Sequence, residues 1–475
     1  MKPIAKPIAA KPIAVDDLAG RLGRWSAGRG SLYLLLAARL RELIDEGLLP
    51  SGTLLPPDRS LASGLAVGRT TVIAAYDLLR QEGRLTRRRG SGTWVSPGGG
   101  AAAARPETAN PMFVNLLEPP DGVLQFACAG PLAPPDRLVE ACRRVADRLA
   151  VVDLGYHPSG HPALRAALAA RYSGLGVPTG SDQILVTTGA QQALALLTRA
   201  LVRPGDEVLV EAPTYPGALD LFREAGAVIR ADDDLAGALG RCKPALVYAM
   251  PAFRNPTGSS MSTLERTRLT RVAGDVPLVF DEVLAELDLT GAPSRPPVPE
   301  AVTVGSLSKV VWGGLRIGWV RADAALVGRL ARFKAVQDLG SAVLDQLAAV
   351  ELLADFTAVR SARVTALRRQ HDHLCALLRE ELPEWEFTAA AGGQTLWARL
   401  PGVDAASYAQ VALRHGVAVL PGGSLDPTGG STDRLRLPFT AEPEVISTAV
   451  AGLAAAWRAF AAEPARPRLV PSMSV

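Results

Sequence analysis

The sequence predicts a multidomain protein, in which a small N-terminal α+β domain of the winged helix-turn-helix type is linked to a large α/β domain that ends in a small α+β lobe. Three observations support this prediction. Helical periodicity followed by a basic hairpin occupies residues 28–96, small unpatterned residues at 97–110 indicate a linker over 97–119, and short apolar runs alternate with helical segments beyond residue 120. The 475 residues are 48% hydrophobic and 21% charged, a composition that excludes a disordered chain or a small disulfide scaffold.

The N-terminal residues 1–27 show no sustained period. The sequence Lys-Pro-Ile-Ala occurs three times within residues 2–14, and proline disfavours a regular helix. We therefore expect an extended or disordered segment. The prolines also interrupt the apolar stretch of a secretory signal, and the chain lacks the run of about 18 apolar residues that a membrane-spanning helix needs. The expected location is the cytoplasm, with no membrane partner.

Residues 28–96 predict three helices and a two-stranded wing. From Ser31 onward, leucines recur every three to four residues and predict the first helix. Asp58 is expected to cap a short second helix, and a third helix begins at about Arg69. Residues 85–95 predict a hairpin with an arginine-rich turn.

The charge is divided unevenly along the chain. Residues 1–97 carry 15 Lys and Arg against 8 Asp and Glu, whereas the remaining residues carry 36 against 39. Residues 1–97, the head, therefore carry a net charge of +7, and the rest of the chain, the body, carries −3. A basic head of this kind indicates a polyanion-binding module. A helix-turn-helix places the start of its third helix against base edges, and other basic residues contact phosphates or the minor groove. The expected base contacts are Arg69, Thr70 and Thr71, and the expected backbone contacts are Arg59, Arg87, Arg88 and Arg89. A winged-helix module for protein interaction is the alternative.

This head resembles the winged helices of the GntR family of bacterial regulators. The resemblance rests on Leu-Leu-Pro at 54–56, Arg-Ser-Leu-Ala at 59–62, Val-Gly-Arg-Thr-Thr-Val at 67–72 and Gly-Ser-Gly-Thr at 90–93. It implies double-stranded DNA as the partner and Arg59, Arg69, Thr70 and Thr71 as contacts. Pro57 departs from the family, in which serine is frequent at this position.

The body after the predicted linker is expected to contain a mostly parallel sheet with helices on both faces. Near-continuous apolar runs predict strands at residues 184–186, 207–210, 245–250, 278–280 and 301–304, and helices are predicted at 191–201, 217–225 and 264–272. The large domain is expected to span residues 120–370, and the small lobe 371–463, with a final helix over 442–460 and a tail over 464–475.

Lysine usage singles out one position in the body. The chain has 45 Arg and only 6 Lys, and a lysine that must lose its proton to act as a nucleophile cannot be replaced by arginine. Lys309 follows the predicted strand 301–304, at the strand end where open α/β sheets bind ligands. Ser306, Ser308 and Arg316 lie near it in sequence and can bind a phosphate. A solvated loop lysine is the alternative.

Other predicted strand ends carry complementary groups. Asp281 can hold a pyridine nitrogen protonated, although an aspartate here can also cap a helix. The Asn255 amide can donate to a phenolic oxygen, or can belong to an ordinary turn. Ala190 and Gln191 open a helix, whose N–H groups favour phosphate. Tyr215 can stack on an aromatic ring.

The body, over about residues 120–460, closely resembles the fold-type-I aminotransferases that use pyridoxal 5′-phosphate. The resemblance implies that Lys309 forms the Schiff base, Asp281 bonds the pyridinium nitrogen, Asn255 bonds the ring hydroxyl and Tyr215 stacks on the ring. It places Ala190, Gln191, Ser306, Ser308 and Arg316 around the phosphate. It also implies that Arg436 grips the α-carboxylate of an amino acid, and that Tyr156 reaches the phosphate of a neighbouring subunit in a homodimer. Val283 departs from related regulators, which often have a tyrosine two residues after the aspartate.

A metal site is not expected. His157 and His161 are four residues apart, but the prolines and glycine around them exclude a regular helix, and no third ligand lies nearby in sequence. The four cysteines are widely spaced and form no Cys-x-x-Cys pair.

The combination of a winged helix with an aminotransferase-like body resembles the MocR-type branch of the GntR family. It implies a nucleoid-associated transcriptional regulator whose body senses pyridoxal 5′-phosphate, an amino compound, or both. The alternative is a working aminotransferase that carries a DNA-binding head. Lys309, Asp281 and Arg436 are compatible with both functions, whereas Val283 and the intact head favour the regulator.

Overall fold

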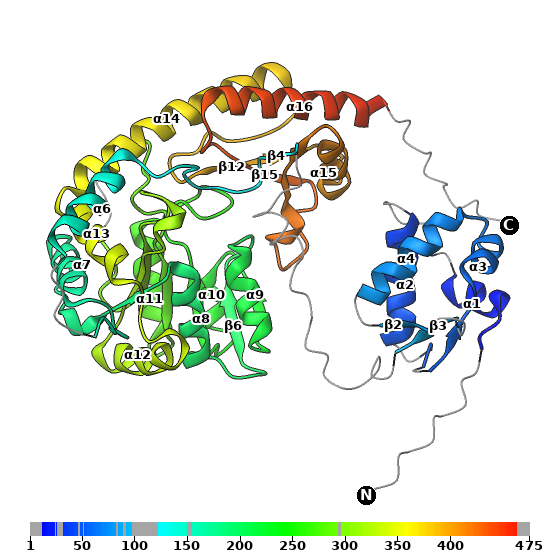
Figure 1. Cartoon of the computed structure of the whole chain (residues 1–475), viewed down its shortest axis with the longest axis horizontal. Coiled ribbons are helices and arrows are strands. Elements are labelled where there is room, and N and C mark those ends of the chain that lie inside the picture. Colours follow the sequence, from blue (N-terminus) through cyan, green and yellow to red (C-terminus); the bar gives the residue numbers. More distant parts are fainter. Residues whose placement is uncertain are drawn as a thin grey trace, which may run out of the picture. The chain divides into compact units, whose positions relative to one another are not determined.

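The computed structural model describes residues 12–23, 25, 32–45, 48–50, 52–81, 84–88, 92–96, 122–149, 154–292 and 296–462. The chain divides into two compact units, Met1–Pro111 and Met112–Val475 (Figure 1). The predicted linker 97–119, the tail 464–475 and Arg89 lie outside the described residues. Within the described part, no helix has the length and apolar character needed to span a membrane.

The N-terminal unit is a winged helix-turn-helix, as predicted. Its predicted helices are α2 (Leu32–Asp45), α3 (Asp58–Gly64) and α4 (Arg69–Gln81), and the wing is formed by β2 (Leu85–Arg88) and β3 (Gly92–Val95). Leu36, Leu40 and Leu43 of α2 are buried in one core with Val72, Ala75 and Leu79 of α4. A third strand, β1 (Leu54–Leu55), pairs with β3 in the register Leu54↔Trp94. This strand was not predicted, because two residues carry no alternation signal.

The prediction of an extended or disordered segment over residues 1–27 was wrong at α1 (Val15–Leu22). Leu18 and Leu22 are buried in the core of the head. A Cβ added at Gly64 would lie 2.3 Å from Val15 Cγ1, so the glycine permits α1 to approach α3 closely. An eight-residue helix beside proline-rich repeats is too short for a clear period, and its stability comes from this packing.

The prediction of Asp58 as an N-cap was also wrong. Pro57 occupies the N-cap position of α3, and Asp58 is the first helical residue. The Asp58 carboxylate accepts a hydrogen bond from Nε of Arg69 at 2.8 Å. The two helices of the helix-turn-helix are therefore joined at their N-terminal ends by an ion pair.

A seven-stranded sheet in the order β5-β11-β10-β9-β8-β6-β7 forms the centre of the body. Its strands are β5 (Ile184–Thr187), β6 (Glu207–Val210), β7 (Val228–Ala231), β8 (Leu246–Ala249), β9 (Leu278–Asp281), β10 (Val302–Ser306) and β11 (Gly318–Arg321). All neighbours are parallel except at β11, which is antiparallel to both β10 and β5. The five predicted strands are present. Strands β7 and β11 were missed because each carries an arginine, and neither forms a continuous apolar run.

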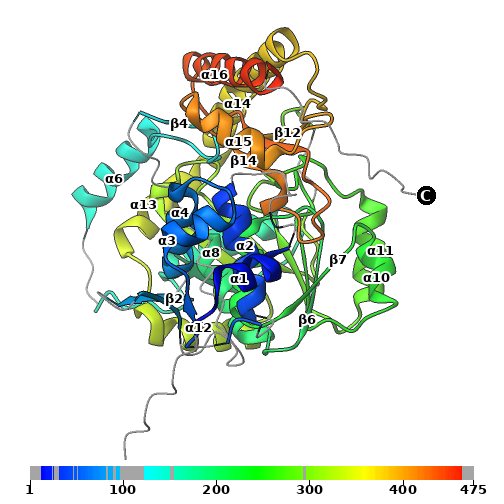
Figure 2. The same ribbon diagram turned by 90° about the vertical axis from the view of Figure 1, so that its right-hand side faces the viewer.

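Helices cover both faces of this sheet. Val208 and Val210 of β6 pack into one apolar core with α8 (Ala190–Leu201) and α9 (Pro216–Glu224). Leu209, between them, packs into a second core with α10 (Leu235–Leu239) and α11 (Thr263–Ala273). Figure 2 shows α10 and α11 on one side of the sheet and α8 with α12 (Ala324–Asp338) on the other. The remaining large-domain helices are α6 (Asp136–Arg148), α7 (Pro162–Gly174) and α13 (Val343–Ala354).

The predicted boundary of the small lobe at residue 371 falls within the 26-residue helix α14 (Phe356–Glu381). The lobe continues through β12 (Thr395–Arg399), α15 (Ala405–Arg414), β13 (Val417–Ala418), β14 (Leu420–Pro421), β15 (Arg434–Pro438) and α16 (Pro443–Ala462). The strand β4 (Leu124–Gln125) pairs in parallel with β13, so the start of the body joins this lobe. The sequence alone places β4 in the large domain, because it lies within the predicted range 120–370.

Candidate functional site

Lys309 lies just beyond the end of β10, and both its side-chain amine and its backbone carbonyl form hydrogen bonds. Its Nζ donates a hydrogen bond to the Ala129 carbonyl at 2.6 Å, and its own carbonyl accepts from Nε of Arg363 and Nε2 of Gln394, each at 3.3 Å. Burial, together with the charge of Arg436, lowers the pKa of the Lys309 amine to about 8. This amine can therefore lose its proton near neutral pH and act as a nucleophile.

Asp281 ends the neighbouring strand β9 and is buried. Its carboxylate accepts hydrogen bonds from the Tyr248 hydroxyl at 2.9 Å and from the Val283 amide at 3.1 Å. Burial raises the pKa of this carboxyl, while both hydrogen bonds and the Lys309 charge oppose the rise. Tyr248 was not identified from the sequence. A tyrosine inside an apolar run looks like an ordinary core residue, and the sequence does not show that its hydroxyl reaches Asp281 at the end of the next strand.

Arg436 reaches the same site from β15 of the small lobe. Nη1 donates to Asn255 Oδ1 at 3.1 Å, and Nη2 donates to the Ala127 carbonyl. Among the described residues, nothing accepts a hydrogen bond from its buried Nε. Burial lowers the pKa of this guanidinium to about 10. A buried guanidinium with an unused donor is suited to a carboxylate ligand.

The start of α8 forms a second polar edge of the site. Gly189 precedes this helix with φ +85°, and a Cβ there would lie 2.8 Å from Nη2 of Arg316. Arg316 itself has φ +55° and donates from Nη2 to the Thr188 carbonyl at 2.6 Å. The Tyr215 hydroxyl donates to Gln191 Oε1 at 3.0 Å. Burial raises the pKa of Tyr215 to about 12, so the phenol stays protonated.

Two serines complete this edge. Ser306 Oγ donates to the Ile317 carbonyl at 2.9 Å and lies 2.9 Å from Ser308 Oγ. With the N–H groups at Ala190 and the Arg316 guanidinium, these hydroxyls provide the donors that a phosphate needs.

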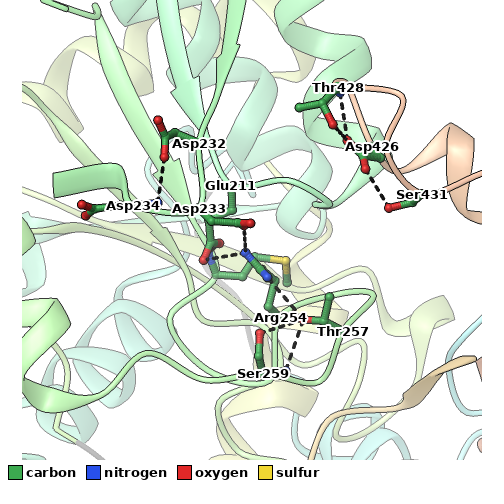
Figure 3. A network of polar contacts seen from close by, with 11 residues as sticks. Glu211, Asp232, Asp233, Asp234, Arg254, Thr257, Ser259, Asp426, Thr428 and Ser431 are labelled. Carbon is green, nitrogen blue, oxygen red and sulfur yellow. Dashed lines mark hydrogen bonds and ion pairs between the residues drawn. The ribbon is translucent and has the colours of Figure 1, made fainter. Parts of the chain in front are cut away.

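A polar network supports the loop that carries Asn255. Glu211, directly after β6, accepts a hydrogen bond from the Met250 amide at 2.8 Å. Figure 3 shows Arg254 between Glu211 and Asp233, and Nη1 lies 3.5 Å from a carboxylate oxygen of each. Burial raises the pKa of Glu211 to about 7, although Arg254 opposes this shift. None of these network residues was predicted.

The structure does not bring Tyr156 into this set of contacts, since 64% of its surface is exposed in the loop before α7. His157 and His161 stack edge to face with centroids 5.0 Å apart, and His161 Nδ1 caps α7 by accepting from the Ala163 amide. Within the described ranges, no group of three or more His, Cys, Asp or Glu side chains is placed to hold a metal ion.

In the head, the candidate residues come from α3, from the start of α4 and from β2. Arg59 and Thr70 are exposed, Thr71 is half-buried, and Arg87 is exposed on β2. The ion pair with Arg69 lowers the pKa of Asp58. The Arg88 side chain lies outside the described part of the chain, as does the whole of Arg89.

Comparison with protein families agrees with this architecture. Residues 131–453 match the family model for aminotransferase classes I and II. The chain belongs to this family. Residues 32–95 match the model for bacterial regulatory proteins of the GntR family. The chain thus combines a GntR DNA-binding domain with an aminotransferase domain, as MocR-type regulators do, and its recognition as a member of this branch is confirmed.

Several relatives cover most of the chain. The 2-aminoadipate transaminase of Thermus thermophilus is 33% identical over 368 residues, which are 72% of this chain and 91% of the relative. The HTH-type transcriptional regulator YisV of Bacillus subtilis is 28% identical over 88% of this chain and 95% of its own length. The probable rhizopine catabolism regulatory protein MocR of Rhizobium meliloti is 28% identical over 78% of this chain and 85% of its own.

Among solved structures, the α-aminoadipate aminotransferase LysN of Thermus thermophilus, complexed with N-(5′-phosphopyridoxyl)-L-leucine, has a TM-score of 0.67 and 30% identity over 74% of this chain and 95% of its own. The family and fold of the body imply pyridoxal 5′-phosphate as the cofactor. The residues fit this group, because the structure provides a half-buried amine with a lowered pKa, a buried carboxylate at the next strand end, a guanidinium from the small lobe with an unused Nε, and a helix N-terminus preceded by a glycine.

Proposed function

We propose that the body of this regulator senses an amino compound, or the cofactor itself, through Lys309, and that the result controls DNA binding by the head. The observation that carries the proposal is the joint presence of a half-buried lysine with a pKa of about 8 and an intact winged helix in one chain. A site that only positions a structural cation has no need of an amine that deprotonates.

The cofactor, when bound, supplies an aldehyde that bonds to amines and a ring that withdraws electrons. In this proposal the Lys309 amine holds it covalently, and the Asp281 carboxylate keeps a proton at the pyridine nitrogen. Asn255 donates to the ring oxygen and Tyr215 stacks on the ring. The groups that bind the phosphate are Ala190, Gln191, Ser306, Ser308 and Arg316.

Arg436 provides selectivity for the sensed compound. Its guanidinium is buried, and its Nε has no acceptor among the described residues. A carboxylate on the amino compound would accept from this donor and satisfy it. The proposed effector is therefore a carboxylate-bearing amine.

The head is proposed to read double-stranded DNA by Arg69, Thr70 and Thr71 in the major groove, with Arg59, Arg87, Arg88 and Arg89 on the backbone. A DNA partner supports a location in the cytoplasm at the nucleoid. The exposure of Tyr156 supports a homodimer in which this side chain reaches the partner's cofactor phosphate.

A working aminotransferase is the second candidate. Lys309, Asp281 and Arg436 are all present, and a transaminase is among the relatives at 33% identity. Catalysis requires repeated exchange between an amino donor and a 2-oxo acid, whereas sensing requires only one change of state.

The test uses the full chain, DNA fragments selected by that chain, and a range of amino acids. Lys309→Ala should lose the visible absorption of the lysine-linked cofactor, retain DNA binding and lose the response to amines. Lys243→Ala, which removes an exposed lysine, should retain all three properties. Many turnovers by the wild type with an amino donor and a 2-oxo acid would favour the enzyme. Persistence of the absorption band in Lys309→Ala would exclude the lysine assignment.

A further inference from the structure

A cavity of about 620 Å³ lies beside the strand ends of the body and borders the candidate cofactor site at Ser306. Glu282 lines this cavity, whereas its neighbour Asp281 belongs to the candidate site. Successive side chains leave an extended chain on opposite sides, which explains why adjacent carboxylates serve two different spaces. Four aromatic side chains also form its walls: Tyr172, Phe253, Trp319 and Phe356.

Most charged groups of the cavity already have partners. Arg171 forms an ion pair with Glu286. The Arg266 guanidinium donates to two backbone carbonyls, those of Pro251 and Pro296, each at 3.4 Å. Asp288 accepts hydrogen bonds from the Thr290 and Gly291 amides at 2.7 and 3.0 Å.

Glu282 differs from these groups. In the part of the chain that the structure describes, no hydrogen bond or ion pair is formed by the Glu282 carboxylate. A half-buried carboxylate of this kind can accept a hydrogen bond from the ammonium of a ligand. Two of the aromatic rings already face a guanidinium, since Arg171 Cζ lies 4.1 Å from the Phe356 ring centroid and Arg321 Cζ lies 5.6 Å from that of Tyr172. The aromatic walls therefore supply apolar contact, and Glu282 supplies the charge. The volume lies within the range of small-molecule sites.

We propose that this cavity is a second ligand site, which takes a small organic amine in its protonated form. The ammonium bonds to the Glu282 carboxylate, and the apolar part of the ligand packs against the aromatic walls. The proposal goes beyond the sensing function and does not depend on it. Because Val283 and Ser306 also line the cavity, an occupant touches both strand ends that carry the candidate cofactor site.

The electrostatics of the cavity agree with this ligand. Burial raises the pKa of Glu282 to about 7, opposed by Arg266 of α11 and Arg321 of β11, and supported by Glu286 and Asp281. Arg171 of α7 also faces the cavity, paired with Glu286. A bound cation favours the ionised carboxylate, so amine binding should strengthen as the pH rises through about 7.

The test is calorimetric titration of the full-length holoprotein with phenethylamine, after borohydride reduction has blocked the amine at the cofactor. We expect binding to one site per chain. Glu282→Gln should weaken it at least about tenfold, because an ionic hydrogen bond is replaced by a neutral one. Asp288→Asn removes the same charge from the same cavity but can keep its backbone bonds, and it should change the affinity less than about twofold.

Phenethyl alcohol, which has the same ring without the charge, should bind the wild type at least about tenfold more weakly than the amine. This comparison needs no variant and so does not depend on the folding of Glu282→Gln. The proposal is overturned if the reduced holoprotein does not bind phenethylamine, if the alcohol binds equally well, or if Glu282→Gln and Asp288→Asn behave alike.

Discussion

Tyr248 on β8 donates its hydroxyl hydrogen to Oδ2 of Asp281 on β9 at 2.9 Å. The tyrosine is fully buried, and burial raises its pKa well above the usual range, so it remains a donor. Two residues after Asp281, where related regulators often have a tyrosine, Val283 contributes only its backbone amide to this carboxylate. A neighbouring strand therefore supplies the hydroxyl that stabilises the charged form of Asp281.

Replacement of Tyr248 by phenylalanine should weaken the binding of pyridoxal 5′-phosphate about tenfold, the equivalent of one hydrogen bond to a charged group. Loss of the bond raises the pKa of Asp281 further, so less carboxylate is available for the pyridine nitrogen. Absorbance titration of the apoprotein measures this affinity. Tyr408→Phe removes an equally buried hydroxyl, bonded to the Leu453 carbonyl, and should leave cofactor affinity unchanged. Equal losses in both variants would contradict a specific role for Tyr248.

Arg436→Lys should reduce the affinity for α-amino acids about 100-fold, because lysine retains the charge but not the forked geometry. The affinity for amines without a carboxylate should fall less than about threefold, since these ligands do not bind the Arg436 guanidinium. Competition against the absorption change caused by each ligand measures both. Arg434→Lys, at a half-buried position in the same strand, provides the control and should affect neither ligand. A uniform loss for amino acids and simple amines would mean that Arg436 acts only on the fold.

Arg69→Ala should cost about 1–3 kcal/mol on the cognate DNA site and relax the base preference at one position. Arg80→Ala lies in the same helix, where the arginine pairs with Asp77, and should change specific binding little. Fluorescence anisotropy on cognate and random duplexes distinguishes the two variants. If Arg69→Ala weakens both duplexes equally, Arg69 contacts the backbone and not a base.

Ionisation of Glu211 should lower the free energy of unfolding of the apoprotein as the pH rises from about 4.5 to about 7. The folded-state pKa of about 7 exceeds the ordinary value of 4.5, so within this window the folded chain keeps a proton that the unfolded chain has released. Glu211→Gln should reduce the change in unfolding free energy across this pH window by on the order of 1–3 kcal/mol, as measured by urea unfolding. Glu265→Gln is the control, since the pKa of Glu265 is lowered and its contribution has the opposite sign. An unchanged slope in Glu211→Gln would contradict the buried, protonated carboxyl.

Much of the architecture could be predicted because buried parallel strands leave continuous apolar runs, as β6, β8 and β9 do. Lys309, Asp281 and Arg436 could be located because polar residues directly after such strands, or within a characteristic motif, are few. The contacts that support them could not. These contacts involve Tyr248, Arg363 and Gln394, which come from elements far apart in the chain. The local sequence does not show which side chains of distant elements are in contact. The helix α1 was missed for a related reason, since its stability depends on the core that it joins.

The hydrogen bond from Lys309 Nζ to the Ala129 carbonyl has a consequence for communication along the chain. A lysine whose nitrogen is engaged with the cofactor has fewer hydrogens to share, so occupation of the site and retention of this bond compete. Ala129 belongs to the first described stretch after the N-terminal unit, the same stretch whose β4 is paired with β13. In the proposed function, a change at this nitrogen would alter its bond to the segment that follows the N-terminal unit in the sequence.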